Sequence, residues 1–387
     1  MLEKSKKILI LSTSFWPLVG GSETAIREVV DRLSDYNFDL ITARLNNNFL
    51  PVEQTGNLRI FRVGNGLNFF KFLLPKNFLP LAIFRLARKL LKENKYDLVH
   101  VFQASQAGGA AWLLKKLGSN CPVVLTLQEG ENLAKQSWLT RFFRTRIIKN
   151  ADQATAISQY LLTYLKQTKK NISARLIPNG VDLQKFSQDF SYGELSQLED
   201  NLGIKPGAKV IISTSRLVEK NGLDNLIKAL AVLQKEYPKE DWRLLLVGDG
   251  PLAESLKFQV ESLKLEKQVI FKAAVSHEEL SKYLKISHVF VRPSRSEGLG
   301  VSFLEAMAAG VPIIGSAVGG IPDFLTHEET GLICDPHSPA DIAEKIKLIL
   351  DDDNLRKNIV KKARELVEEK YDWNKIVEDY RRLYETV

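Results

Sequence analysis

Short apolar runs alternate with helical patterns along the whole chain. The runs occupy 7–13, 39–43, 58–63, 98–102, 123–127 and 154–157 in the first half, and 210–214, 243–247, 269–272 and 288–291 in the second. Each run is too short for a typical buried helix and is therefore interpreted as a strand. Strands that alternate with helices predict an α/β fold with parallel, doubly wound sheets, which bind their ligands at the carboxyl ends of the strands.

The order of these elements predicts two domains. The turn-rich stretch 177–182 closes the first domain, and the polar stretch 187–208 is interpreted as the connection to the second. We predict a first domain over 1–186 and a second, including this linker, over 187–372. Helical patterns follow at 340–350, 354–369 and 373–387.

The loop after the last predicted strand is the strongest candidate for a binding site. The strand ends before Pro293, a polar loop with Gly298 and Gly300 follows, and a helical pattern runs from Val301 to Gly310. Glycines free the loop backbone to approach a ligand closely. The start of a helix offers unpaired N–H groups and the positive end of the helix dipole, so this segment suits an anion.

Two glutamates bracket that segment, Glu297 in the loop and Glu305 in the helix. Carboxylates accept hydrogen bonds from hydroxyl groups but repel phosphates. Phosphate-binding amides beside hydroxyl-binding carboxylates predict a ligand that is part phosphate and part sugar.

Two other strand ends carry features of an anion site. Gly20 and Gly21 lie between the first strand and a helical pattern, although a plain tight turn explains the pair equally well. Arg216 and Lys220 follow the first strand of the second domain. A guanidinium and an ammonium group can neutralise a diphosphate, whereas isolated basic residues are usually only solvated.

The sequence from Gly248 to Ala253 fits the Gly-x-Gly-x-x-Ala fingerprint of dinucleotide-binding proteins. That fingerprint requires an acidic residue at the end of the next strand to hold a ribose. The next strand ends in Lys272, so we interpret this segment as a tight turn.

Composition narrows the compartment. The 387 residues are 44% hydrophobic and 26% charged, as in ordinary globular proteins. The two cysteines have neither metal-ligand nor redox spacing, which fits a reducing cytosol. The apolar run 8–11 is too short for a signal peptide, and no apolar segment reaches the ~18 residues of a membrane-spanning helix.

The charge is unevenly spread. Up to Lys185 there are 27 Lys and Arg against 13 Asp and Glu, and the remainder has 27 against 33. A basic first half suggests an anionic partner such as a membrane surface, a phosphorylated substrate or nucleic acid. No helix-turn-helix, zinc finger or RNA-binding aromatic motif is present, so nucleic acid is not expected.

Two segments of the first half combine basic and aromatic residues. The segment 67–95 has seven Lys and Arg and one acidic residue, and the segment 135–149 has five basic residues and no acidic ones. Such segments can lie in a membrane interface and attract anionic lipid. Packing of their apolar faces on the sheet is the alternative.

The Glu297-to-Glu305 spacing, followed by Ala-Met-Ala-Ala-Gly-Val-Pro, resembles the signature of the retaining GT-B glycosyltransferases of family four, the group 1 glycosyltransferases. The similarity extends over about 210–352, and Pro-Asn-Gly-Val-Asp at 178–182 resembles the linker of that family. The resemblance implies two facing Rossmann-like domains with a cleft between them. It also implies that the last helix, 373–387, packs back on the first domain.

The resemblance further implies a nucleotide-diphosphate sugar as the donor. Arg216, Lys220 and the amides of the loop would stabilise the leaving diphosphate, Glu297 would hold sugar hydroxyls, and Glu305 would hold ribose hydroxyls. The donor-binding residues carried over in this way are Gly20, Gly21, Arg216, Lys220, Glu297, Gly298, Leu299, Gly300, Val301 and Glu305. One departure is that Asn221 stands where the family usually has the lysine.

On the acceptor side the resemblance points to His100, Gln128 and Glu129. Gln128 replaces a histidine that is frequent in the family, so a titrating side chain at this strand end is in doubt. For His100, a hydrogen-bonded histidine at a strand end is as good an interpretation as an acceptor contact.

Taken with the resemblance, these observations predict a metal-independent, hexosyltransferase-type enzyme without a cofactor, and the resemblance implies that it retains the configuration of the sugar. Its partners would be a UDP-, GDP- or ADP-sugar donor, a glycan or lipid-linked acceptor and an anionic membrane surface. We expect the enzyme in the cytoplasm, either free or at the inner face of the membrane. We expect it to act in polysaccharide biosynthesis. The alternatives are a sugar-nucleotide epimerase or phosphorylase, or a non-catalytic protein that binds a sugar nucleotide or a membrane surface.

Overall fold

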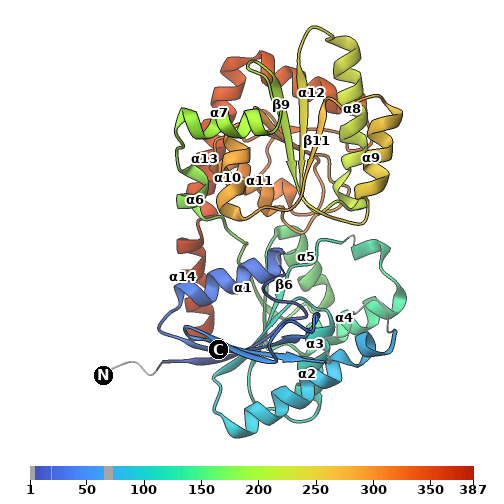
Figure 1. Cartoon of the computed structure of the whole chain (residues 1–387). Coiled ribbons are helices and arrows are strands. Elements are labelled where there is room, and N and C mark those ends of the chain that lie inside the picture. The colour runs from blue at the N-terminus through green and yellow to red at the C-terminus, as the bar shows by residue number, and fades with distance from the viewer. Residues whose placement is uncertain (1–4, 19, 65–72, 132) are drawn as a thin grey trace. The chain divides into compact units, whose positions relative to one another are not determined.

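A computed structural model describes residues 5–18, 20–64, 73–131 and 133–387 (Figure 1). The chain forms two compact units, one of Met1–Asn179 with Trp373–Val387 and one of Gly180–Asp372. The boundary thus precedes Gly180, whereas the sequence placed it after residue 186. Residues 67–72, the start of the first basic-aromatic segment, lie outside the described residues.

The first unit is built on a sheet of eight strands, in which only β3 is antiparallel to its neighbour. In spatial order the strands are β3 (Val52–Thr55), β4 (Leu58–Val63), β2 (Asn37–Ala43), β1 (Lys7–Leu11), β5 (Leu98–Phe102), β6 (Val123–Leu127), β7 (Gln153–Ala156) and β8 (Ser173–Leu176). The central strand β1 is buried from Ile8 to Leu11, which explains its continuous apolar sequence.

Helices cover both faces of this sheet (Figure 1). They are α1 (Gly21–Arg32), α2 (Leu73–Glu93), α3 (Gln106–Lys116), α4 (Trp138–Asn150), α5 (Gln159–Thr168) and α14 (Trp373–Glu385), with a 3-10 turn η1 (Leu133–Lys135). On one face, Ile8 and Ile10 of β1 share a core with Ile26 of α1 and with Tyr380 and Leu383 of α14. The last helix of the chain is therefore part of the first unit.

The second unit has a sheet of six parallel strands. In spatial order they are β11 (Val269–Lys272), β10 (Trp242–Val247), β9 (Lys209–Thr214), β12 (Val289–Arg292), β13 (Ile313–Gly315) and β14 (Leu332–Ile333). Its helices are α6 (Leu183–Ser187), α7 (Tyr192–Asn201), α8 (Leu223–Glu236), α9 (Ala253–Ser262), α10 (His277–Lys285), α11 (Val301–Ala308), α12 (Pro339–Asp351) and α13 (Asp353–Lys370), with 3-10 turns η2 (Glu219–Asn221) and η3 (Ile321–Asp323). Leu244 and Leu246 of β10 pack with α8 and α12 in one core.

Each sheet reverses its strand order beside its first strand. The chain winds from β1 to β2 on one side and resumes at β5 on the other, and in the second unit it winds from β9 to β10 and resumes at β12. Loops diverge at such a switch point and leave room for a ligand at the carboxyl ends of the strands. In the second unit, the loops that diverge carry Lys220 and Glu297. The two doubly wound units predicted from the sequence are thereby confirmed.

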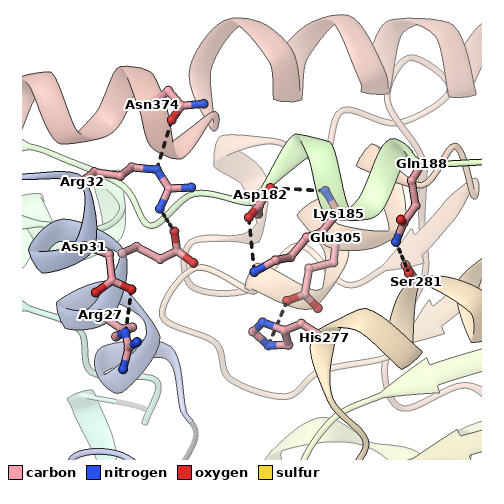
Figure 2. A network of polar contacts seen from close by, with 11 residues as sticks. Arg27, Asp31, Arg32, Asp182, Lys185, Gln188, His277, Ser281, Glu305 and Asn374 are labelled. Carbon is pink, nitrogen blue, oxygen red and sulfur yellow. Dashed lines mark hydrogen bonds and ion pairs between the residues drawn. The ribbon is translucent and has the colours of Figure 1, made fainter. Parts of the chain in front are cut away.

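The earlier boundary follows from the packing of α6. Phe186 is buried, and α6 contacts both α10 and α11. The amide of Gln188 donates to Ser281 of α10 at 3.1 Å, and Figure 2 shows this contact beside the Asp182–Lys185 pair. The residues after 180 are thus held by the second unit.

The sequence analysis missed a helix and two short strands of the second unit. The stretch 187–208, taken as a polar connection, contains α7, which begins at a reciprocal capping box between Ser191 and Glu194. The short strands β13 and β14 were not predicted at all. Strands of two or three residues give too little periodicity to be recognised from sequence.

The last helix is fixed to the first unit by polar contacts as well as by its core residues. The Arg381 guanidinium pairs with Asp35, and Lys6 donates to the carbonyl oxygen of Tyr384 at 2.5 Å. In Figure 2, Arg32 of α1 donates to the side chain of Asn374 at 3.1 Å.

Candidate functional site

Glycines bound the helix α11, which follows the loop after β12. Gly300 is the N-cap of α11 with a φ of 103°, a region that favours glycine. At the other end, Gly310 has a φ of 78°, and the N–H of Val311 donates to the carbonyl of Ala306 at 2.9 Å. This bond is the six-residue closure of a Schellman motif, so α11 begins and ends where its glycines allow.

Glu297 lies at the tip of this loop with both carboxylate oxygens engaged. Its Oε2 accepts from Nη2 of Arg292 at 2.8 Å, and its Oε1 accepts from the N–H of Gly298 at 3.0 Å. The ammonium group of Lys220 lies 3.6 Å from Oε1. The carboxylate is thus held between two cations, and its side chain is 13% exposed.

Lys220 belongs to the loop that follows β9. Burial lowers the pKa of its ammonium group, and the nearby Glu297 opposes that effect. The next residue, Asn221, is buried and its amide donates to the carbonyl of Arg216 at 2.7 Å, which closes the loop. The one-residue offset from the family spacing therefore leaves Lys220 facing Glu297, while Asn221 serves the turn. Arg216 itself is exposed.

Close backbone contacts hold the loops after β9 and β12 together. Gly222 has a φ of 69°, and a Cβ placed on it would lie 2.0 Å from the carbonyl oxygen of Pro293. The Arg295 guanidinium bonds the carbonyl of Glu219 at 2.9 Å and pairs with Asp224 at 2.7 Å. The relative positions of Lys220 and Glu297 are fixed by these contacts and do not depend on their own ion pair alone.

A third loop, which follows β13, also contacts the backbone of Glu297. A Cβ on Gly319, whose φ is 57°, would lie 1.8 Å from the carbonyl oxygen of Glu297, and the N–H of Gly320 donates to that oxygen at 3.3 Å. Gly319 and Gly320 after β13 therefore pack against the backbone of Glu297 and help to fix its position.

Glu305 lies in α11 and is 7% exposed. Burial raises the pKa of its carboxyl group, and the charges of His277 and Arg292 oppose that effect. Nε2 of His277, the first residue of α10, lies 3.9 Å from Oε1 of Glu305, and Figure 2 shows the two side chains pointing toward one another. A carboxylate in this position can accept hydrogen bonds from a ligand hydroxyl.

The glycines between β10 and α9 serve packing. A Cβ on Gly248 would lie 2.1 Å from the carbonyl oxygen of Ser215, and one on Gly250 would meet the backbone of Leu217. Asp249 accepts from the N–H of Ala274 at 3.0 Å. This segment is a tight turn that lies against the loop after β9, in agreement with the interpretation of the sequence.

The three consecutive aspartates 351–353 are engaged in local contacts. Asp351 pairs with Lys347, Asp352 caps α13, and Asp353 pairs with Arg356. Within the described ranges, no group of three His, Cys, Asp or Glu could hold a metal ion. Absence of a metal cofactor stays a prediction.

In the first unit, the helix start at Gly20 and Gly21 already holds a carboxylate. Glu23 is buried, accepts from the hydroxyls of Ser14 and Ser22, and reaches back over Gly20, where a Cβ would lie 2.6 Å from its Oε2. The backbone of Gly20 is extended, so its conformation does not require glycine. A negative side chain at this helix start makes it a poorer cradle for phosphate than the sequence suggested.

His100 lies in the middle of β5 and not at its end. It is fully buried, with Nδ1 2.7 Å from the hydroxyl of Tyr384 and Nε2 2.7 Å from that of Thr126. Burial lowers its pKa to about 3. The side chain is hydrogen-bonded on both ring nitrogens, as one of the two sequence interpretations expected, but that interpretation was wrong in placing it at the strand end.

Gln128 and Glu129 follow β6 and are both buried. Oε1 of Gln128 accepts from Asn179 at 3.2 Å, while its Nε2 has no protein partner. Glu129 accepts from the N–H of Ala104 at 2.8 Å and lies 3.7 Å from Nε of Arg144. Glu129 thus joins β5 and β6 to α4, and Gln128 is the better candidate to meet a ligand.

The two basic-aromatic segments differ in how they are packed. In α2, among the side chains described from residue 78 onward, Leu79, Ile83, Phe84, Ala87 and Leu90 are buried, and the exposed large apolar residues are Phe78 and Leu81. In α4 four large apolar side chains are exposed, namely Trp138 (78%), Leu139 (48%), Phe142 (44%) and Phe143 (43%). Within the described part of the chain, no helix has both the length and the apolar character to cross a membrane.

Arg292, which the sequence did not single out, proves central to the site. It ends β12, is 5% exposed, and contacts Glu297 directly. A sequence shows an arginine's charge but not its burial, so the only signal was an arginine at the end of an otherwise apolar strand. The structure brings together Arg292, Lys220 and Glu297, with Glu305 on the adjoining helix.

Comparison with known proteins covers both units. The description "Glycosyl transferases group 1" belongs to the family model that matches residues 196–366, and "Glycosyltransferase Family 4" to the one that matches 19–185. The chain is 30% identical over 382 residues, with 95% of each chain covered, to the GDP-mannose-dependent alpha-(1-6)-phosphatidylinositol monomannoside mannosyltransferase of Mycobacterium tuberculosis.

Another relative and a solved structure agree. The chain is 28% identical over 381 residues to the N-acetyl-alpha-D-glucosaminyl L-malate synthase of Bacillus anthracis, covering 97% of this chain and 96% of that protein. Sucrose-phosphate synthase from Thermosynechococcus elongatus has a TM-score of 0.85 to it, at 24% identity and with 98% of each chain covered. The GT-B fold expected from the sequence is confirmed.

Proposed function

The chain belongs to the group 1 glycosyltransferases of family four and is an enzyme of the hexosyltransferase type; from this premise we propose that it moves a sugar from a nucleotide-diphosphate donor to a glycan or lipid-linked acceptor, with retention of configuration and without a metal ion. The donor would lie on the second unit, at the carboxyl ends of β9 and β12. Which base, sugar and acceptor it uses would be decided by experiment.

The observation that supports this proposal most is the contact between Lys220 and Glu297 beside the start of α11. A diphosphate leaving group gains negative charge as the bond to the sugar breaks. Lys220, the exposed Arg216 and the N–H groups of the loop around Gly300 offer positive charge there. Positive groups of this kind can replace a metal ion as the partner of the diphosphate.

The two carboxylates suit the neutral parts of the donor. Glu297 would accept hydrogen bonds from sugar hydroxyls, and Glu305 from the ribose hydroxyls. A carboxylate held by Arg292, Lys220 and an amide is a weak nucleophile, which favours attack by the acceptor on the same face from which the diphosphate departs. Such attack retains the configuration of the sugar.

We propose that the acceptor is presented at an anionic membrane surface through α4. Its four exposed apolar side chains are accompanied by the exposed Lys135, Arg141, Arg146 and Lys149, and the segment carries no acidic residue. Aromatic side chains that enter the interface and basic ones that attract anionic lipid would act together. The enzyme would then work in the cytoplasm, at the inner face of the membrane, in polysaccharide or glycolipid synthesis.

The test is incubation of the protein with UDP-, GDP- and ADP-sugars and candidate acceptors in EDTA, followed by product analysis. A glycosylated acceptor with the donor's anomeric configuration supports the proposal. Isomerised sugar would identify an epimerase, and sugar phosphate a phosphorylase. Donor binding without turnover of any acceptor would favour the non-catalytic reading, which the glutamine at position 128 had suggested.

A further inference from the structure

Arg292 is a buried charge that the proposed reaction does not yet use. It stands at the end of an apolar strand, and burial lowers the pKa of its guanidinium, opposed by the charges of Glu297 and Glu305. Removing a guanidinium from water is costly unless its donors are satisfied and its charge is paired. The contacts that satisfy it therefore show what the side chain does.

All three guanidinium nitrogens donate hydrogen bonds, two to the loop after β12 and one to the start of α11. Nε donates to Ser294 Oγ at 3.1 Å, Nη1 to Ser302 Oγ at 2.6 Å and Nη2 to Glu297 Oε2 at 2.8 Å. The group also stacks on Phe303, 4.6 Å from the ring centroid. Arg292 thus ties the beginning of the loop, its tip and the first turn of α11 into one rigid piece.

The two cations on Glu297 differ in their surroundings. The side chain of Arg292 is 6% exposed and fixed by the three hydrogen bonds, whereas that of Lys220 is 35% exposed and lies 3.6 Å away. They also engage different oxygens, Oε2 for Arg292 and Oε1 for Lys220. A ligand can therefore draw Lys220 away while the contact with Arg292 persists.

We propose that Arg292 is a positioning residue for sugar recognition: it holds Oε2 of Glu297 so that Oε1 faces the donor sugar, and it keeps the carboxylate paired when Lys220 turns to the diphosphate. This role rests on the proposed function of the same site. In this role Arg292 affects which sugar is bound, and not how tightly the nucleotide is bound, although the donor does not touch its side chain.

The test measures two dissociation constants by calorimetry for each variant, with UDP, GDP and ADP as nucleotide probes and UDP-glucose, UDP-N-acetylglucosamine, GDP-mannose and ADP-glucose as donor probes. In Arg292→Met the ratio of the donor constant to the nucleotide constant should rise at least about tenfold, with nucleotide binding almost unchanged. In a Glu297→Gln background the same change should add nothing to the ratio, because its target is gone. Arg243→Met, at an arginine of β10, is the matched control.

The outcomes separate the two proposals. If the unaltered protein binds none of the probes, the proposed function fails. If it binds a donor but Arg292→Met leaves the ratio unchanged, or changes it equally with and without Glu297, the positioning role is overturned alone. Weaker nucleotide binding at a constant ratio would make Arg292 a diphosphate ligand and overturn it too.

Milder variants keep the inference testable if Arg292→Met fails to fold by circular dichroism. Arg292→Lys keeps a charge near Glu297 but loses the fork to the serines, and Ser302→Ala removes one of the three ties. Both should raise the ratio, each by less than Arg292→Met is expected to. An unchanged ratio in both variants would contradict the inference.

Discussion

Nζ of Lys220 lies 3.6 Å from Oε1 of Glu297, so a cation from the loop after β9 meets a carboxylate from the loop after β12. The two residues are far apart in sequence and are joined only because their strands are neighbours at the switch point of the sheet. In the proposed reaction each would serve a different part of the donor. The contact therefore marks the place where the bond between sugar and diphosphate would break.

Lys220→Met is expected to lower the rate of sugar transfer by about 100-fold or more, because it removes one preorganised positive group from the leaving diphosphate. Nucleotide affinity should fall as well. Initial rates at saturating and limiting donor separate the two effects. Lys235→Met, at an exposed lysine of α8, is the control and should leave both unchanged. Rates within twofold of the unaltered enzyme would remove Lys220 from the site.

Gly222→Ala is expected to destabilise the second unit by more than about 2 kcal/mol, because it adds a backbone clash with Pro293 to the cost of a positive φ. Gly207→Ala is the matched control: its φ is 83°, yet nothing lies within 4 Å of the added Cβ. That change should cost only about 1 kcal/mol. Native-state hydrogen exchange of the β9 and β12 amides measures both. Equal costs would show that the contact with Pro293 is not constraining.

The stability of the first unit should fall as the pH drops from about 6.5 toward 3 because of His100. The pKa of His100 is lowered to about 3 in the folded protein, whereas it is about 6.5 in the unfolded chain. As the pH falls, the unfolded chain is therefore protonated at His100 before the folded protein is. The stabilisation from the neutral His100 is complete above about pH 6.5 and is lost as the pH falls toward 3. The His100 contribution to the slope is about 1.4 kcal/mol per pH unit within this window.

Urea unfolding at pH 7.5, 6.0 and 4.5 of the unaltered protein and of His100→Gln isolates that contribution. The stability advantage of the unaltered protein should shrink with decreasing pH. An advantage that is the same at all three values would show that His100 is not held neutral.

Replacing both Trp138 and Phe142 by serine should reduce binding to vesicles with phosphatidylglycerol at least about tenfold, because two large apolar side chains no longer enter the interface. Vesicle flotation measures it. Phe258→Ser, at a residue of α9 that is 71% exposed, is the control and should bind as the unaltered protein does. Equal binding to neutral phosphatidylcholine vesicles would contradict the role of the basic residues.

The sequence was informative where a local pattern dictates the structure. Strands such as β4, β5 and β6 were predicted to the residue, because continuous apolar runs between turns have few alternatives. Glu297 and Glu305 were placed in one loop and one helix by the glycines around them. The helix α7 was missed, although Ser191 and Glu194 form the capping box at its start and are recognisable in the sequence.

What the sequence could not provide depends on contacts between distant segments. The burial of His100 depends on Tyr384 of the last helix, and the need for glycine at 222 depends on the carbonyl of Pro293. Arg292 was missed for a different reason: its three partners, Ser294, Glu297 and Ser302, are near in sequence, but only the folded loop brings them onto its guanidinium. Periodicity reports which face of an element is apolar, but not which partner covers it.

The measurement that most directly tests the central claim is a thermal-shift screen of UDP, GDP, ADP and their sugar conjugates in EDTA, repeated with Lys220→Met and Glu305→Ala. A ligand at 100 times its dissociation constant stabilises the folded state by about 2.7 kcal/mol. We predict a clear rise in melting temperature with one nucleotide family, reduced in both variants but retained in Lys235→Met. No rise with any of them, or a rise that survives in both site variants, would contradict a metal-free nucleotide-sugar site built on β9, β12 and α11.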